Sequence, residues 1–154
     1  MRINIKHIIK LILELFFIYA FTGGVYLAIE TLYRGYSFMG MYYLAGIIGI
    51  IAYFINNTIM SYKTDFTIQV LTMTAIGTFF EGLYGNLFNM NYLTWDYRAL
   101  PLSLWNDQIN VIFIFAWLLI MTFTIPLLDY IDYKVFGGEK PYYIVFGKRK
   151  DLNI

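Results

Sequence analysis

The chain contains no cysteine and only one histidine, His7, among its 154 residues. Without cysteine it can form neither a disulfide nor a thiolate metal site. A histidine-based metal site or a Ser-His-Asp triad inside the protein is excluded as well, because His7 lies in the basic N-terminal segment. The sequence therefore predicts no metal ion and no cofactor.

Charged residues are also scarce. They make up 14% of the chain, whereas a soluble domain has about 25%. Hydrophobic residues reach 60%, and the mean hydropathy is +0.61. This composition indicates an integral membrane protein with a single domain. The net charge of +1, without a basic stripe interleaved with aromatic residues, gives no reason to expect a nucleic-acid partner.

The common sequence motifs of nucleotide hydrolysis and of hydrolytic catalysis are missing. No G-x-x-x-x-G-K-[ST] occurs, so the chain does not hydrolyse ATP by itself. Neither H-E-x-x-H nor G-x-S-x-G occurs, and an intramembrane enzyme would have to work with carboxylates, tyrosines and arginines alone. We therefore do not expect an enzyme, and we rank that alternative last.

What the sequence does contain is long apolar runs. The hydrocarbon core of a bilayer is about 30 Å thick, so a helix needs about 20 apolar residues to cross it. Four runs reach this length: 11–33, 38–60, 66–89 and 107–128. A tail, 129–154, follows the last of them. We predict an all-α, polytopic membrane fold with four transmembrane helices. The first run is too long for a cleaved signal peptide and has no small-residue cleavage site after it, so we expect it to be retained.

Positive charges are distributed unevenly between the two sides that four spans define. One side has only Arg34 and Arg98. The other side has Arg2, Lys6, Lys10, Lys63, Lys134, Lys140, Lys148, Arg149 and Lys150. By the positive-inside rule we predict that both termini are cytoplasmic, in the cytoplasmic membrane of a bacterium. The lipid bilayer is then the first expected partner.

Two short segments resemble each other within the chain. IETLYRG (29–35) and FEGLYGN (80–86) share Glu-x-Leu-Tyr, which aligns Glu30 with Glu81 and Tyr33 with Tyr84. A duplication would give two parallel helical-hairpin repeats. Chance similarity in a biased composition is the alternative.

Glu81 is the most unusual residue of the predicted spans. An ionised residue at the bilayer centre costs about 2.5–3.5 kcal/mol on insertion scales, so this carboxylate should be paired, protonated or functional. Gly77 and Gly85 lie four residues before and after it, on one helix face, which allows a neighbouring helix to approach closely. Ala45 and Gly49 in the second span offer a matching surface. Glu81 belongs either to a substrate or proton site or to a lock that fixes helix packing.

Further polar residues gather on the predicted outer side. Glu30 and Arg34 have the spacing of a helical ion pair, although Arg34 could instead reach Glu81, Asp96 or an anionic ligand. Trp95, Tyr97 and Arg98 lie in the connection 90–106, where Trp and Tyr suit the membrane interface. Asn106, Asp107 or Gln108 could cap the fourth span. The candidate substrate site comprises Glu30, Arg34, Glu81, Asn89, Asp96 and Gln108.

Four stretches between about residues 23 and 143 carry a family resemblance. They are GG-x5-E-x3-RGYS from Gly23, E-x3-G-x3-N from Glu81, WDY (95–97) with Pro101, Gln108 and Trp117 after it, and Asp129 with FGGEKPYY. In this order and spacing the sequence resembles the CmpB-like family of small membrane proteins described as type IV ABC-transporter permeases. The resemblance implies a transport-related membrane subunit, with a separate ATP-binding subunit as a candidate partner.

We therefore expect a permease-like component of membrane transport, with a polar site near the outer leaflet. The alternative is a non-transporting structural or regulatory membrane subunit whose buried polar cluster only locks helix packing. A homo-oligomer is expected in either case, because four short helices enclose little volume.

Overall fold

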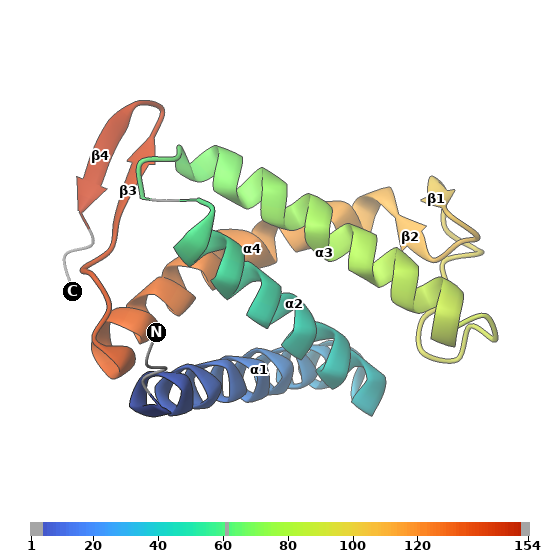
Figure 1. Cartoon of the computed structure of the whole chain (residues 1–154). Coiled ribbons are helices and arrows are strands. Elements are labelled where there is room, and N and C mark those ends of the chain that lie inside the picture. Colours follow the sequence, from blue (N-terminus) through green and yellow to red (C-terminus); the bar gives the residue numbers. More distant parts are fainter. Residues whose placement is uncertain (1–4, 61, 152–154) are drawn as a thin grey trace. The chain divides into compact units, whose positions relative to one another are not determined.

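The computed structural model describes residues 5–60 and 62–151, with Lys6 and His7 described only in their backbone. Arg2, which contributes to the predicted orientation, and the last three residues of the predicted tail lie outside the described residues. Helices account for 67% of the structure, which confirms the mostly helical fold. They are α1 (Ile5–Arg34), α2 (Met39–Thr58), α3 (Phe66–Phe88) and α4 (Val111–Ile131), and a π-helical turn, Asp132–Phe136, follows α4 (Figure 1).

Four helices among the described residues are long and apolar enough to cross a membrane, as the sequence predicts. The first begins at Ile5 rather than at 11, and the fourth begins at Val111 rather than at 107 and ends at Ile131 rather than at 128. Its N-cap is Asn110, whose side chain accepts a hydrogen bond from the backbone N–H of Ile112 at 2.9 Å. The prediction of a cap at Asn106, Asp107 or Gln108 is therefore wrong. Those residues belong to a folded connection that precedes the helix.

The chain divides into two compact units, which we describe separately. The first extends to Ile51 and contains α1 and most of α2. These helices touch at their small residues: a Cβ atom on Gly23 would lie 2.7 Å from the backbone oxygen of Tyr42, and one on Gly49 would overlap Thr22. Glycine at these positions thus sets the close approach of the two helices.

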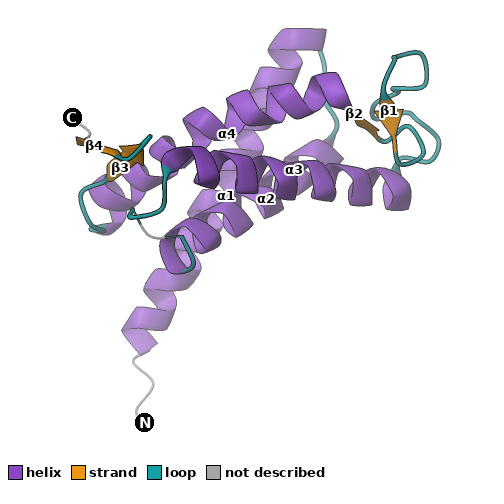
Figure 2. Ribbon diagram, turned by 90° about the horizontal axis from the view of Figure 1, so that it is seen from above, coloured by secondary structure: helices purple, strands orange, loops and turns teal. Residues whose placement is uncertain are grey.

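The second unit, Ala52–Ile154, is built on the pair α3–α4. The two helices lie side by side, and a Cβ atom on Gly77 would lie 3.0 Å from the ring of Trp117 (Figures 1 and 2). Trp117 of α4 and Gln108 just before that helix contact the face of Gly77 and Gly85, whereas Gly49 in the first unit faces Thr22 of α1. The predicted match of Gly77 and Gly85 with Ala45 and Gly49 would join the two units and stays a prediction.

Two short antiparallel hairpins, which the sequence analysis did not predict, lie at opposite ends of α3–α4 (Figure 2). β1 (Ser103–Leu104) pairs with β2 (Ile109–Asn110) in the connection before α4. β3 (Tyr142–Val145) pairs with β4 (Lys148–Asp151) in the C-terminal tail. Each strand is too short for a clear alternating pattern, which is why the pairing was not visible in the sequence.

Candidate functional site: two buried carboxylates and the loop over α3

Glu81 lies on α3 and is buried, with 5% of its surface exposed. The Tyr97 hydroxyl donates a hydrogen bond to its Oε1 at 2.8 Å. The Trp117 indole N–H, from α4, donates to its Oε2 at 2.7 Å. Both carboxylate oxygens are therefore paired, which meets the need that a buried carboxylate imposes.

Tyr97 reaches Glu81 because the loop 89–110, between α3 and α4, folds inward over the helix pair. The Tyr97 ring stacks on Phe113 of α4, with 4.7 Å between ring centroids. The Trp95 ring stacks on Tyr84 of α3 at 5.8 Å. Both Trp95 and Tyr97 are buried, and each donates a hydrogen bond inside the protein. Their place at a membrane interface stays a prediction.

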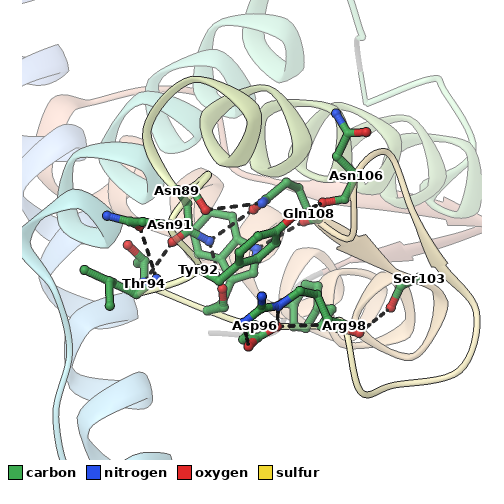
Figure 3. A network of polar contacts seen from close by, with 12 residues as sticks. Asn89, Asn91, Tyr92, Thr94, Asp96, Arg98, Ser103, Asn106 and Gln108 are labelled. Atoms are coloured by element: carbon green, nitrogen blue, oxygen red, sulfur yellow. Dashed lines mark hydrogen bonds and ion pairs between the residues drawn. The ribbon is translucent and has the colours of Figure 1, made fainter.

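A second group of buried contacts joins the C-cap of α3 to the residue before β2, about two helical turns beyond Glu81 (Figure 3). The Asn89 amide donates to Gln108 Oε1 at 3.0 Å, and the Gln108 amide donates to the Asn89 carbonyl at 3.2 Å. The Thr94 backbone N–H donates to Asn89 Oδ1, and the Trp95 indole donates to the Gln108 carbonyl. Asn89 and Gln108 have no exposed surface. We call the contacts of Glu81, Asn89 and Gln108 with this loop the outer lock.

The outer lock holds the loop in an unfavourable backbone conformation. Left-handed φ angles of 50–62° occur in this loop at Tyr92, Leu102, Trp105, Asn106 and Asp107. For residues other than glycine this conformation costs about 1–2 kcal/mol each. Such a loop persists because its buried hydrogen bonds and ring contacts compensate for that cost.

Asp96 and Arg98 lie at the exposed edge of the same loop (Figure 3). Arg98 Nε and Nη2 donate to the two oxygens of Asp96 at 2.9 and 2.7 Å. These bonds, together with the Arg98 backbone N–H, lower the pKa of Asp96 to about 2. The carboxylate of Asp96 is therefore paired with Arg98. Tyr97, rather than Asp96, contacts Glu81.

Glu30 and Arg34 belong to the first unit. The predicted i, i+4 ion pair is confirmed, with 3.0 Å between Arg34 Nη2 and Glu30 Oε1. The Ser37 hydroxyl also donates to Glu30, and the Arg34 guanidinium lies 4.8 Å from the centre of the Tyr36 ring. Of the six candidate residues, Asn89 and Gln108 contact each other, Glu81 lies about two helical turns before Asn89, and Asp96 is at the exposed edge of the same loop. The partners of Glu30 differ from those of Glu81, and the proposed duplication stays a prediction.

The sequence analysis missed a second buried carboxylate, Asp129 of α4, which is 2% exposed. The Asn56 amide donates to its Oδ1 at 2.6 Å, and the Tyr143 hydroxyl donates to its Oδ2 at 2.7 Å. Burial raises the pKa of Tyr143, and the charge of Asp129 raises it further. The predicted fourth span ends at 128, which places Asp129 in the tail. The sequence signal for its burial is its position four residues after the apolar Ile125, on the same helix face.

Two threonines of α3 have unusual surroundings. Among the described residues, the hydroxyls of Thr74 and Thr78 are buried and have no hydrogen-bond partner. Other helical threonines, such as Thr22 and Thr122, donate to the backbone carbonyl four residues earlier, each at 2.8 Å. A buried hydroxyl without a partner costs about 1–3 kcal/mol. These two groups therefore remain available to bond with something other than their own helix.

The described part of the chain contains no group of three His, Cys, Asp or Glu side chains that could hold a metal ion. Comparisons of the chain with family models, with curated proteins and with solved structures gave no match.

Proposed function

We propose that this chain is a permease-like component of membrane transport, similar to type IV ABC-transporter permeases. In this proposal the four apolar helices cross the cytoplasmic membrane of a bacterium, and both termini are cytoplasmic. The excess of Lys and Arg at the N-terminus, at Lys63 and in the tail supports this orientation. The ordered motifs from Gly23 to the FGGEKPYY segment support the family.

A buried polar stripe on α3 carries the proposal. Thr74, Thr78 and Glu81 lie at i, i+4 and i+7 on one helix face, and Gly85 continues it. The stripe rises about 10 Å from Thr74 to Glu81. Polar groups inside an apolar span are costly, and they commonly mark the pathways of substrates and ions. The two hydroxyls without a partner distinguish this stripe from simple packing.

The stripe also indicates what it could bind. Its free atoms are hydroxyl oxygens, and its charged group is a carboxylate, so it would favour a proton, a small cation or a ligand with hydrogen-bond donors. Tyr97 and Trp117 cover the carboxylate. A substrate could therefore reach Glu81 only after the loop 89–110 moves away, which makes this loop the gate of the proposed site.

The experiment that tests the family assignment is recovery of the tagged full-length chain from its native membrane in a gentle detergent, followed by mass spectrometry. We expect an ATP-binding subunit at near-stoichiometric amount, because the chain has no nucleotide-binding motif of its own. An unrelated membrane protein recovered in parallel is the control. Recovery of the chain with only further copies of itself would contradict an ABC transporter.

The second candidate is a non-transporting structural or regulatory membrane subunit. The outer lock favours it, because Asn89 and Gln108 are fully buried and both oxygens of Glu81 are paired. Under this alternative the carboxylate fixes the loop 89–110 and binds nothing else. The two candidates differ in what the charge of Glu81 does, and a substitution discussed below separates them.

A further inference from the structure

The β3–β4 hairpin is fixed to one end of the α3–α4 pair (Figures 1 and 2). The Tyr143 hydroxyl of β3 donates to Asp129 of α4. Ile144 forms an isolated parallel bridge with Asp65, the N-cap of α3. The Thr67 backbone N–H donates to Asp65 and is the main cause that lowers its pKa, and the backbone of Gly147 and Phe146 at the turn of the hairpin lowers that pKa further. The hairpin is thus held at the point where α3 begins and α4 ends.

The register of the hairpin sorts its side chains between two faces. Tyr143 lies opposite Lys150, and Val145 lies opposite Lys148. Residues directly opposite each other in an antiparallel pair share a face. Tyr143, on this face, points to α4, so Lys148 and Lys150 extend from the face that is turned toward the helix ends. Both lysines are nevertheless exposed.

Arg149 lies on the opposite face and is already occupied. Its side chain pairs with Asp151 at 2.9 Å. Its guanidinium also lies 4.0 Å from the centre of the Tyr142 ring. The face with Lys148 and Lys150 carries no acidic residue, so its positive charge is not compensated within the hairpin.

The turn of the hairpin adds an apolar contact. Phe146 has 83% of its surface exposed and lies at φ 50°, between the ends of the two strands. An aromatic side chain next to lysines, at the end of an apolar helix, matches the boundary between headgroups and acyl chains. Lysine stems can extend along that boundary while their ammonium groups stay at the headgroups.

We propose that Lys148, Lys150 and Phe146 form a surface that binds the anionic phospholipid headgroups of the leaflet at this end of α3–α4. The lysines contact the phosphates, and Phe146 enters the interface beside them. Charge complementarity selects this partner, because the face presents two exposed cations and neither strand of the hairpin places an acidic residue on it. The inference rests on the membrane insertion that is part of the proposed function, and it does not require transport.

The test uses the absence of cysteine from the chain. Phe146→Cys provides a single site for a nitroxide label in the full-length protein, reconstituted into nanodiscs of phosphatidylcholine with increasing phosphatidylglycerol. Collision of the label with oxygen and with a water-soluble nickel complex reports its depth. We expect the label to move into the interface as phosphatidylglycerol increases, and to move out again at high salt, which screens the charges.

The lysines are tested in the same labelled background. Each lysine near an anionic surface raises the association constant about five-fold. Lys148→Gln combined with Lys150→Gln should therefore lower the association constant of the hairpin for the phosphatidylglycerol surface, taken from the depth of the label, about 30-fold. Arg149→Gln, on the opposite face, is the matched control and should change the response less than two-fold. The same substitutions are then made in the unlabelled chain, which keeps Phe146. By native mass spectrometry, the parent chain and Arg149→Gln should retain similar amounts of phosphatidylglycerol, and the paired lysine variant should retain less.

Three results would overturn the inference. The label could stay in water at every phosphatidylglycerol content, the paired lysine variant could respond like the parent chain, or Arg149→Gln could weaken the response as strongly. Incorporation into the nanodisc is measured separately by co-elution of protein and lipid. Failure to incorporate would refute membrane insertion itself, whereas a water-exposed label on an incorporated chain would refute only the lipid surface.

Discussion

At the residue scale, Glu81 is held by two donors of different kinds. The Trp117 indole can only donate, whereas the Tyr97 hydroxyl can donate or accept. Glutamine at this position would accept from Trp117 and donate to Tyr97. The hydrogen bonds of the outer lock would then survive without the negative charge. Glutamine therefore removes charge alone, while leucine removes both charge and hydrogen bonding.

The unfolding free energy of the two variants tests this exchange of hydrogen bonds. We expect Glu81→Gln to keep the thermal unfolding midpoint of the purified protein, with a change in unfolding free energy below about 1 kcal/mol. Glu81→Leu should lose about 2–6 kcal/mol, because it removes the acceptor to which two buried side chains donate. Both variants are compared with the parent chain in the same detergent by intrinsic tryptophan fluorescence.

The functional result decides what the charge does. If Glu81 binds a substrate or a proton, Glu81→Gln should abolish substrate-stimulated ATP hydrolysis by the recovered complex although the fold is intact. If the carboxylate only locks the loop, Glu81→Gln should behave as the parent chain in every assay. Equal destabilisation by glutamine and leucine would contradict the described exchange of hydrogen bonds with Tyr97.

At the element scale, α3 depends on glycine where the loop 89–110 presses against it. A Cβ atom on Gly85 would lie 2.5 Å from Gln108 Oε1 and 2.6 Å from Gln108 Cβ. The Cβ of Gln108 is fixed to the backbone and cannot move away as a side-chain end could. We expect Gly85→Ala to cost about 1–3 kcal/mol and to release the loop.

Gly24 provides the matched control. It lies within α1, and a Cβ atom there would meet nothing within 4 Å. Gly24→Ala should be neutral or stabilise the chain by up to about 1 kcal/mol, because alanine favours helix. Amide hydrogen exchange should accelerate in residues 89–110 for Gly85→Ala and stay unchanged there for Gly24→Ala. Unchanged protection of the loop in Gly85→Ala would contradict the close packing of Gln108.

At the scale of the whole molecule, the two hairpins lie at opposite ends of the α3–α4 pair, and the pair is about as long as a bilayer core is thick. α3 has 23 residues, which corresponds to about 34 Å. If the helices cross the membrane with the termini inside, Ala99 in the loop 89–110 is external and Lys140 before β3 is internal. Both residues are exposed, so cysteine at either position can react.

The chain without native cysteine makes this topology directly measurable. We expect Ala99→Cys to react with a membrane-impermeant maleimide in intact cells. Lys140→Cys should react only after the membrane is permeabilised, and the unmodified chain should not react in either condition. Labelling of both positions from one side would refute a membrane crossing by α3–α4, and the reverse pattern would refute the orientation predicted from Lys and Arg.

The sequence by itself determined the helical content and the four apolar helices, because both follow from local composition and run length. It also identified the ion pair Glu30–Arg34, whose partners are four residues apart on one helix. Only the tertiary structure decided which donors pair with Glu81, and that Asp129 joins Asn56 and Tyr143. Those contacts depend on how a loop with left-handed residues and a short hairpin fold back onto helices. Residues far apart in sequence meet there, and no local pattern specifies their pairing.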